Sequence, residues 1–475
     1  MTWPATRLGC DLSCRPRFTT LPHLKSPQEQ RLFGTDGIRG RFGEGWLTLA
    51  AVSALGRAIG VVRTRGRARA QRAALVGHDG RRSGPDLEAA IASGLAASGY
   101  SVTSAGLITT PGLALLARSG VFELAAMISA SHNPAEDNGI KFFGADGEKL
   151  PDETEDEIEA ELHAHPQPVS SGPPPALDPA LENLYLAHLE QAAGDLRLAG
   201  TSLVIDCANG GGSRITPRIF GRLGAQVVPL ACAPDGDNIN QDCGSTHPAA
   251  LQEAVRLHSA DLGIALDGDG DRCMLVDENG ALVNGDGILT LLARERAQRK
   301  RFVDPRIVAT VMSNRGLHRA LREVGVQVVT VGVGDRRVVE ALRRERLVLG
   351  GEQSGHIVFG PENHYIGDGT YTALRVLAVL RARGARLSEL ARAYRAFPQV
   401  LINVPVGRKP NLAEVPRVMD EVRRIESELG DDGRVLLRYS GTEPLARVMV
   451  EGPEEAHIRK NAQELANCIA REIGA

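Results

Sequence analysis

The sequence is poor in lysine and in aromatic residues, and it contains no long hydrophobic run. Only six of its 55 basic residues are lysines and the other 49 are arginines, while aromatic residues make up 4% of the 475 positions. No stretch approaches the roughly 20 apolar residues that a membrane helix needs, so we expect no membrane partner. Seven cysteines, an odd number without a CxxC pair or clustered histidines, predict neither a disulfide framework nor a structural zinc site. These absences favour a reducing compartment, and we expect the protein to be cytoplasmic.

The charge and the length narrow the class of protein. A net charge of −3 without any basic run argues against nucleic acid as a partner. At about 150 residues per domain, a chain of 475 residues predicts about three domains. Residues 1–30 contain Pro4, Pro16 and Pro22 but no apolar core of signal-peptide length, so we expect a disordered extension or a misplaced start codon there. The sequence leaves the oligomeric state open between monomer and homodimer.

One stretch of the chain, MISASHNPAEDNGIKFF at residues 127–143, combines a polar turn with a rare lysine. An apolar strand ends at Ile128, a proline stops its continuation, and Asn138-Gly139 starts a returning strand that carries Lys141 back toward the turn. We expect Ser131 to carry a phosphoryl group and Lys141 to lie close to it. A lysine with a lowered pKa exchanges a proton more easily than an arginine does. The alternative is that the turn has no catalytic role.

A second stretch, DGDGDR at residues 267–272, follows a buried strand and places three carboxylates at every second position. A tight turn brings such side chains to one centre, and the oxygen ligands that they provide suit Mg²⁺. An EF-hand calcium loop is rejected, because Arg272 occupies the position where that loop needs glycine and both flanks look like strands. A purely structural acidic turn remains the alternative. Three protein carboxylates leave the remaining coordination positions of the ion to water or phosphate, and a phosphorylated Ser131 would need such a counter-charge.

Two further loops contain polar side chains next to glycines. In LFGTDGIRGRFGEG at residues 32–45, Arg39 and Arg41 can hold an anion, or the segment is a glycine-rich turn with solvated arginines. In GEQSGH at residues 351–356, Glu352 and Ser354 can bind sugar hydroxyls or an amine. His356 titrates near neutrality and can move a proton, although a single loop histidine is often incidental.

A last polar loop, RYSGTEP, occupies residues 438–444. It gathers two hydroxyls, a glycine amide and Arg438, and Arg447 lies on the strand that follows. Hydrogen-bond donors around a glycine with nearby arginines are what a phosphate dianion needs. A capped turn without a ligand is the alternative.

Strands and helices alternate along the chain, which is typical of α/β proteins. Leu87, Ile91 and Leu95 lie at helical spacing and predict a buried helix face, with Ser83 as its N-cap. Six prolines among residues 163–180 indicate a linker or a domain edge. We expect helices at 47–62, 217–223, 249–258, 316–324, 335–344, 370–383, 412–429 and 455–473, and strands at 74–77, 124–128, 140–143, 202–206, 226–230, 262–266, 307–312, 327–331, 434–437 and 446–450.

Taken together, the five polar loops resemble those of the α-D-phosphohexomutases in order and spacing. The resemblance runs from residue 31 to the C-terminus. It implies an α/β protein of four domains around a central cleft, three related mixed α/β domains followed by a smaller C-terminal α+β domain. We expect the extension at 1–30 and domains at 31–180, 181–285, 286–398 and 399–475.

The resemblance also implies a role for individual residues. Ser131 would be the phosphoserine, and Ser131 with Asp267, Asp269 and Asp271 would hold Mg²⁺. Lys141 and His356 would be the acid/base candidates. The remaining implied contacts are Arg39 and Arg272 at the phosphoryl site, Glu352 and Ser354 at the sugar, and Arg438, Ser440, Gly441, Thr442 and Arg447 at the phosphate that is not transferred.

The activity implied by the resemblance is the interconversion of glucosamine 6-phosphate and glucosamine 1-phosphate, which feeds cell-wall precursors. A 1,6-bisphosphate would be the intermediate and, as a hexosamine or hexose bisphosphate, the activator. Gln353 and the wording ISASHNP favour glucosamine over mannose or glucose; a phosphosugar sensor without turnover is the remaining alternative. Tyr439 stands where the family usually has lysine, and HDGRRSG at 78–84 departs from the usual K-D-T-R-x-S-G.

Overall fold

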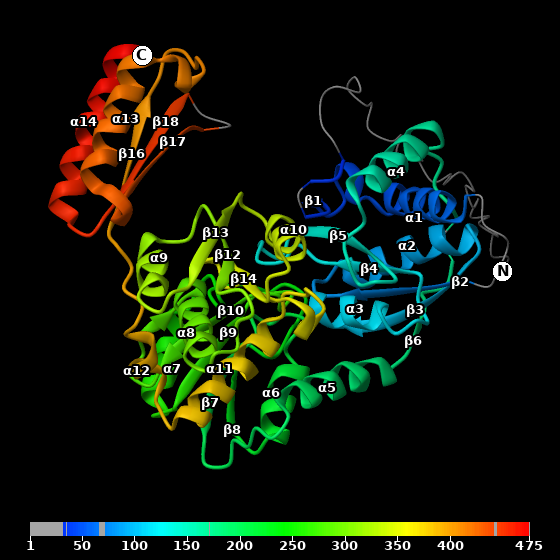
Figure 1. Ribbon diagram of the computed structural model, residues 1–475. Helices are drawn as coiled ribbons and strands as arrows, with labels where there is room; N and C mark the ends of the chain where they lie inside the picture. The colour runs from blue at the N-terminus through cyan, green and yellow to red at the C-terminus, as the bar shows by residue number, and fades with distance from the viewer. Residues whose placement is uncertain (1–31, 35, 66–71, 171, 441–443, 475) are drawn as a thin grey trace, which may run out of the picture.

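The computed structural model describes residues 32–34, 36–65, 72–170, 172–440 and 444–474. The expected extension at residues 1–30 lies outside this part of the chain. The described residues form four sheets that follow one another in sequence (Figure 1). Three of these sheets have helices around them in mixed α/β units, and the fourth is smaller and antiparallel, so the predicted four-unit architecture is confirmed. No helix in the described ranges is long and apolar enough to cross a membrane.

The first unit contains a six-stranded mixed sheet in the order β1-β5-β4-β2-β3-β6. Strand β4 is an uninterrupted buried apolar run, as expected of a strand covered on both faces. It runs parallel to β2 and antiparallel to β5. The turn after β4 and the start of β5 therefore lie at the same end of the sheet. The elements are β1 (Ile38–Arg41), α1 (Leu49–Thr64), β2 (Arg72–His78), α2 (Gly84–Ala97), β3 (Tyr100–Leu107), α3 (Thr110–Ala117), β4 (Leu124–Ile128), β5 (Asp137–Gly144), α4 (Asp152–Ala164) and β6 (Ala176–Leu177).

The second and third units contain sheets of five and four strands, in the orders β11-β10-β9-β7-β8 and β13-β12-β14-β15. The second comprises α5 (Ala180–Ala193), β7 (Ser202–Asp206), α6 (Ile215–Arg222), β8 (Gln226–Leu230), α7 (Ala249–Leu257), β9 (Leu262–Leu266), β10 (Cys273–Asp277) and β11 (Leu282–Val283). The third comprises α8 (Gly285–Gln298), β12 (Arg306–Thr310), α9 (Arg315–Arg322), β13 (Gln327–Val331), α10 (Asp335–Glu345), β14 (Leu349–Gly351), β15 (Ile357–Phe359), α11 (Gly369–Arg383) and α12 (Leu387–Ala391). One hydrophobic cluster, with members from Tyr185 to Leu387, runs through both units.

The C-terminal unit stands apart from the other three and is reached through the segment after α12 (Figure 1). Its antiparallel sheet has the order β16-β18-β17, and its own core is formed by residues between Val400 and Ile473. The elements are β16 (Gln399–Pro405), α13 (Pro416–Leu429), β17 (Arg434–Tyr439), β18 (Leu445–Glu451) and α14 (Glu455–Ile473).

Two local predictions need correction. The helix expected at 412–429 is divided into a 3-10 turn, Leu412–Glu414, and α13, because Pro416 lacks an amide hydrogen and suits the first turn of a helix. Ser83 precedes α2 but its side chain does not cap the helix. Its hydroxyl instead accepts a hydrogen bond from Asn138 Nδ2 at 2.7 Å, which ties α2 to the start of β5. The predicted core positions Leu87, Ile91 and Leu95 are fully buried.

Candidate active site

The turn after β4 places Ser131 deep inside the protein. Ser131 has a φ of +52°, a left-handed conformation that is uncommon for a residue with a side chain, and it is 1% exposed. Its amide donates to Ser129 Oγ at 2.8 Å, and the Ser129 hydroxyl donates to Asp79 Oδ2 at 2.6 Å. These bonds hold the strained turn in one conformation. The Ser131 hydroxyl donates to Asp267 Oδ2 at 2.7 Å, so the serine and the acidic loop meet as predicted.

Two side chains that the sequence did not single out bind the carbonyl groups of this turn. Arg81 Nη2 donates to the carbonyls of Ser131 at 3.0 Å and Asn133 at 2.9 Å, and Nη1 donates to Asp137 O at 2.8 Å and to Pro134 O. Asn240, from the second unit, donates through Nδ2 to the carbonyls of Ser131 at 2.9 Å and Asn133 at 3.0 Å. The departure of HDGRRSG from the family wording was the only sequence signal near Arg81. Only the structure shows that Arg81 supports this loop.

The acidic loop connects β9 to β10. Ligand atoms of Asp267, Asp269 and Asp271 all lie within 4.8 Å of one another, and all three residues are buried. Burial, and then the carboxylates of Asp271 and Asp269, raise the pKa of Asp267 well above its usual value. Gly268 lets the two loops approach, because a Cβ there would lie 2.7 Å from Ser131 O.

This cluster fits a divalent cation. Oδ1 of Asp269 and Oδ1 of Asp271 are buried without a hydrogen-bond partner among the described residues. Buried oxygens in that state are costly, and three carboxylates with like charge require a compensating cation. Hard oxygen ligands favour Mg²⁺ over softer metals. The donor set therefore supports the predicted metal site.

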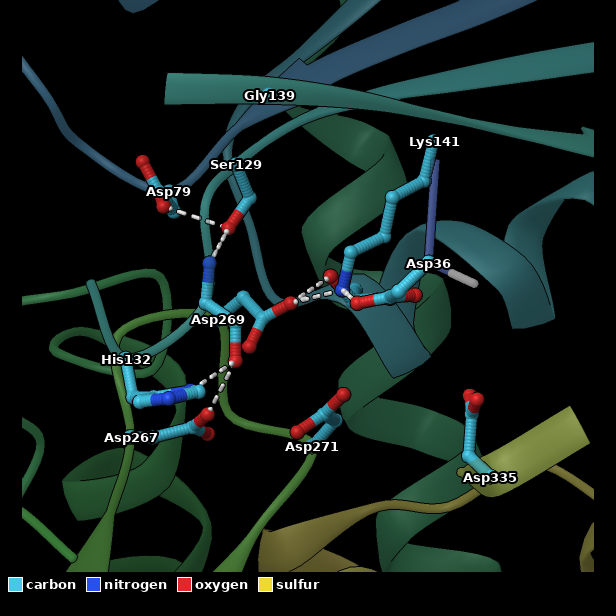
Figure 2. A network of polar contacts seen from close by, with 12 residues as sticks. Asp36, Asp79, Ser129, His132, Gly139, Lys141, Asp267, Asp269, Asp271 and Asp335 are labelled. Atoms are coloured by element: carbon cyan, nitrogen blue, oxygen red, sulfur yellow. Dashed lines mark hydrogen bonds and ion pairs between the residues drawn. The ribbon is translucent and has the colours of Figure 1, made fainter. Parts of the chain in front are cut away.

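Lys141 lies on β5 directly opposite Met127 and is completely enclosed. Its Nζ is 2.9 Å from Asp269 Oδ2 and 3.0 Å from Asp36 Oδ2. Thr110 Oγ1 also donates to Asp269 Oδ2, at 2.6 Å. Burial acts to lower the pKa of Lys141, but Asp269 and Asp36 outweigh it and raise that pKa well above its usual value. The sequence did not show these two carboxylates beside Lys141 (Figure 2).

His356 lies on the far side of the acidic cluster. Its Nδ1 is 3.5 Å from Asp271 Oδ2, and Asp271 outweighs burial and raises the pKa of His356 to about 9. This raised pKa favours the cationic ring, so the predicted titration near neutrality is wrong. Arg272 Nε lies 3.8 Å from Asp267 Oδ2 and 3.9 Å from Asp271 Oδ1. The structure therefore brings Ser131, Lys141, His356 and Arg272 to the acidic cluster.

A row of alternating charges leads away from Asp269. Lys141 pairs with Asp36, which also contacts Lys149, and Lys149 Nζ lies 2.6 Å from Asp335 Oδ2 at the start of α10. We call these five side chains, Asp269, Lys141, Asp36, Lys149 and Asp335, the charge chain. Arg39 Nη2 contacts Asp36, so the predicted anion-binding arginine is linked to this chain through a carboxylate. Asp36, Lys149 and Asp335 were missed, because partners 113 and 186 residues apart leave no local pattern.

The loop with Glu352 and Ser354 connects β14 to β15 and lies against the start of β10. Cys273 N donates to Gly355 O at 3.0 Å, which joins this loop to the residue that follows DGDGDR. Gly355 has a φ of +94°, and a Cβ there would lie 2.4 Å from Cys273 O. Glu352 Oε1 accepts from Gly334 N at 3.1 Å. The expected sugar loop is therefore fixed beside the acidic cluster.

The expected phosphate loop lies on the C-terminal unit, away from the acidic cluster (Figure 1). Arg438 and Arg447 are partners on β17 and β18, and Arg447 Nη2 donates to Ser440 Oγ at 3.4 Å. Gly441 and Thr442 lie outside the described residues. Lys409 Nζ donates to Ser440 O at 2.8 Å and lies 6.0 Å from the Tyr439 ring centroid. The ammonium group of Lys409 therefore lies beside Tyr439. It provides a positive charge near the position where the family usually has a lysine.

A cavity of about 330 Å³ opens between the first and third units. It extends from Lys141, Asp271 and His356 along the boundary between β5 and α10. The walls combine apolar side chains such as Phe143 and Val339 with charged ones. Small molecules of sugar-phosphate size therefore have space next to the acid/base candidates.

Comparisons with known proteins agree with this geometry. Four models described as phosphoglucomutase/phosphomannomutase domains match in order: alpha/beta/alpha domain I at residues 30–168, domain II at 183–280, domain III at 284–397 and the C-terminal domain at 401–467.

Curated relatives match over almost the whole chain. The phosphoglucosamine mutase of Mycolicibacterium paratuberculosis is 47% identical over 447 residues, covering 94% of this chain and 99% of the relative. That of Symbiobacterium thermophilum is 44% identical over 448 residues, covering 93% and 99%. A crystal structure of a phosphoglucomutase/phosphomannomutase family protein from Burkholderia thailandensis superposes with a TM-score of 0.76 at 27% identity, covering 93% and 97%. The chain therefore belongs to the phosphoglucomutase/phosphomannomutase family, the α-D-phosphohexomutases.

Proposed function

We propose that this protein interconverts glucosamine 6-phosphate and glucosamine 1-phosphate through a phosphorylated Ser131 and a bound glucosamine 1,6-bisphosphate. The observation that carries the proposal is the hydrogen bond from the Ser131 hydroxyl to Asp267, inside a carboxylate cluster with unpaired oxygens. The names of the relatives with 44–47% identity support glucosamine as the sugar. In a cell, this activity would supply amino sugar for cell-wall precursors.

In the proposed reaction, the sugar hydroxyl attacks the phosphorus of phospho-Ser131 and loses its proton, which is relayed to Ser131 Oγ as the bond from phosphorus to that oxygen breaks, and a 1,6-bisphosphate forms. The bisphosphate reorients, and its other phosphoryl group returns to Ser131. Asp267, Asp269 and Asp271 would hold Mg²⁺, which neutralises charge on the transferring phosphoryl group when it is bound. A hexosamine or hexose 1,6-bisphosphate would serve as activator by phosphorylating Ser131.

The chain's own residues prepare this reaction. Ser131 is almost inaccessible, which protects a phosphoserine from water. Lys141 and His356 are both held as cations by neighbouring carboxylates, so they can stabilise the negative charge of the transition state and donate a proton to a leaving oxygen. Arg272 adds a third positive charge beside Asp267.

Substrate contacts complete the proposal. Glu352 and Ser354 would bind the sugar, and Arg39 would face the phosphoryl site. Arg438, Ser440, Gly441, Thr442 and Arg447 would bind the phosphate that is not transferred, once the C-terminal unit approaches. The partner is a small sugar phosphate, without nucleic acid or membrane, and the protein would act in the cytoplasm as a monomer or homodimer. We also propose domain boundaries near residues 180, 285 and 398.

Intact mass and turnover of the Ser131→Ala variant test the function. We expect the purified protein to carry one phosphoryl group, and Ser131→Ala to lose both that group and mutase activity with Mg²⁺. Ser101→Ala is the control, because Ser101 lies exposed on β3 and the change removes a hydroxyl without altering the turn that holds the nucleophile. Sugar-phosphate binding of equal strength in the wild type and Ser131→Ala, without turnover in either, would indicate a sensor.

A competition assay tests the sugar. Glucosamine 6-phosphate, mannose 6-phosphate and glucose 6-phosphate are offered together, and we expect the highest kcat/KM for glucosamine. Preference for mannose or glucose would assign the protein to the other branches of the family.

A further inference from the structure

We propose that Lys149 and Asp335 are positioning residues, which couple the sugar loop of the third unit to the placement of Lys141 at the phosphoryl-transfer centre. The inference deepens the proposed function and rests on it. Neither residue touches Ser131 or the acidic cluster. They act through Asp36, the carboxylate on which Lys141 is held.

The geometry of the charge chain is continuous. Lys141 Nζ is shared between Asp269 Oδ2 at 2.9 Å and Asp36 Oδ2 at 3.0 Å. The second oxygen of Asp36 contacts Lys149, whose Nζ lies 2.6 Å from Asp335 Oδ2. Each cation in the chain therefore lies between two carboxylates, and a change at one end alters the charge that the next group meets.

Burial makes the chain sensitive to such a change. The Lys141 side chain is 2% exposed, whereas those of Lys149 and Asp335 are 17% and 23% exposed. Solvent screens charges poorly at these positions, so ion pairs act more strongly than on the surface. Without Lys149, Asp36 would draw Lys141 more strongly and thereby away from Asp269. The ammonium would then be displaced from the centre where a phosphoryl group transfers.

The chain also connects three units of the protein. Asp269 belongs to the second unit, Lys141, Asp36 and Lys149 to the first, and Asp335 begins α10 of the third. Gly334, the residue before Asp335, donates its amide to Glu352 Oε1 in the expected sugar loop at 3.1 Å. A sugar that engages Glu352 therefore changes the environment of the residue next to Asp335. Sugar binding and Lys141 placement are linked by this short path.

Steady-state kinetics of isosteric variants test the inference. We expect Lys149→Met and Asp335→Asn each to lower kcat at least tenfold while KM for glucosamine 6-phosphate changes less than threefold, because the sugar contacts are retained. The double variant should be no worse than the more impaired single variant, since both changes interrupt one chain. Circular dichroism and unfolding midpoints show that each variant is folded.

A charge swap separates positioning from simple attachment of the two units. In Lys149→Glu with Asp335→Lys, the ion pair between the units is restored, but a carboxylate now faces Asp36. We expect kcat to stay as low as in the single variants. Arg82 and Asp237 form an exposed control pair between the first and second units, outside the charge chain and the cavity. Their swap, Arg82→Asp with Asp237→Arg, should keep kcat within threefold of the wild type.

Several outcomes would overturn the inference. Full activity of Lys149→Met and Asp335→Asn would overturn it. Recovery of kcat in the Lys149/Asp335 swap would overturn it too, and so would an equal loss of kcat in the control swap. Hydrogen exchange provides a readout that does not need turnover: amides of β5 should exchange faster in Lys149→Met than in Arg82→Met. If the wild type fails to convert any hexose phosphate, the proposed function fails. Equal exchange in these two variants would then still refute the coupling.

Discussion

Replacing Arg81 by lysine is expected to destabilise the protein by about 3–6 kcal/mol and to lower mutase activity at least tenfold. The Arg81 side chain is fully buried and donates five hydrogen bonds, one to Asp79 Oδ2 at 3.0 Å and four to carbonyl oxygens of the turn that carries Ser131. An ammonium group has three donors, so at least two of these bonds are lost. Each bond to a charged group contributes about 1.5–3 kcal/mol, which gives the expected magnitude.

Arg82 provides the control for this prediction, since it neighbours Arg81 in sequence but lies on the surface with a side chain 69% exposed. Its ion pair with Asp237 is solvated and contributes little to stability, so Arg82→Lys should leave stability and kcat nearly unchanged. Urea unfolding, intact mass for the phosphoryl group and steady-state kinetics are measured on both variants. A loss of stability below 1 kcal/mol with normal phosphorylation in Arg81→Lys would refute the idea that this guanidinium holds the turn.

Three further predictions concern pH, backbone conformation and metal. Burial raises the pKa of Glu88 to about 7, although it accepts a bond from Ser104 Oγ, so the fold disfavours its charged form. The resulting loss in the free energy of unfolding is absent below pH 4.5 and grows as the pH rises to 7. Glu88→Gln should therefore stabilise the protein by about 3 kcal/mol at pH 8 and not at pH 4, as measured by urea unfolding. Gly355→Ala should destabilise the protein by about 2–4 kcal/mol and raise KM for the sugar, because the Cβ of the new alanine would approach Cys273 O. An unchanged unfolding midpoint would contradict this prediction. Mg²⁺ at about 100 times its Kd should stabilise the EDTA-treated protein by about 2.7 kcal/mol, and a shift of equal size in Asp269→Asn would contradict the assigned metal site.

Most of the fold follows from patterns that are local in the sequence. Buried strands such as β4 and β9 are unbroken apolar runs, and α2 shows its core face at helical spacing. The acidic loop was equally visible, because three aspartates separated by glycines have few other uses. These features depend on neighbouring residues only, so the sequence was enough to predict them.

The supports of the site depend on residues far apart in the chain. Arg81 binds the turn at Ser131, 50 residues away, and Asn240 binds it from a distance of 109 residues. His356 was predicted to titrate near neutrality, but carboxylates that arrive from distant loops raise its pKa and that of Lys141. Such contacts are created by tertiary packing and have no local sequence signature.

The core that continues from Tyr185 to Leu387 has a mechanical consequence. Separating the second unit from the third would expose apolar side chains at a cost of about 25 cal/mol per Å². The C-terminal unit has a core of its own and contacts the third unit through polar groups, such as the Arg315 amide with Glu451 and Arg434 with Val311 O. Water can replace hydrogen bonds of that kind when they break. We therefore expect a displacement of the C-terminal unit, at the segment between α12 and β16, to cost less free energy than a separation of the second unit from the third.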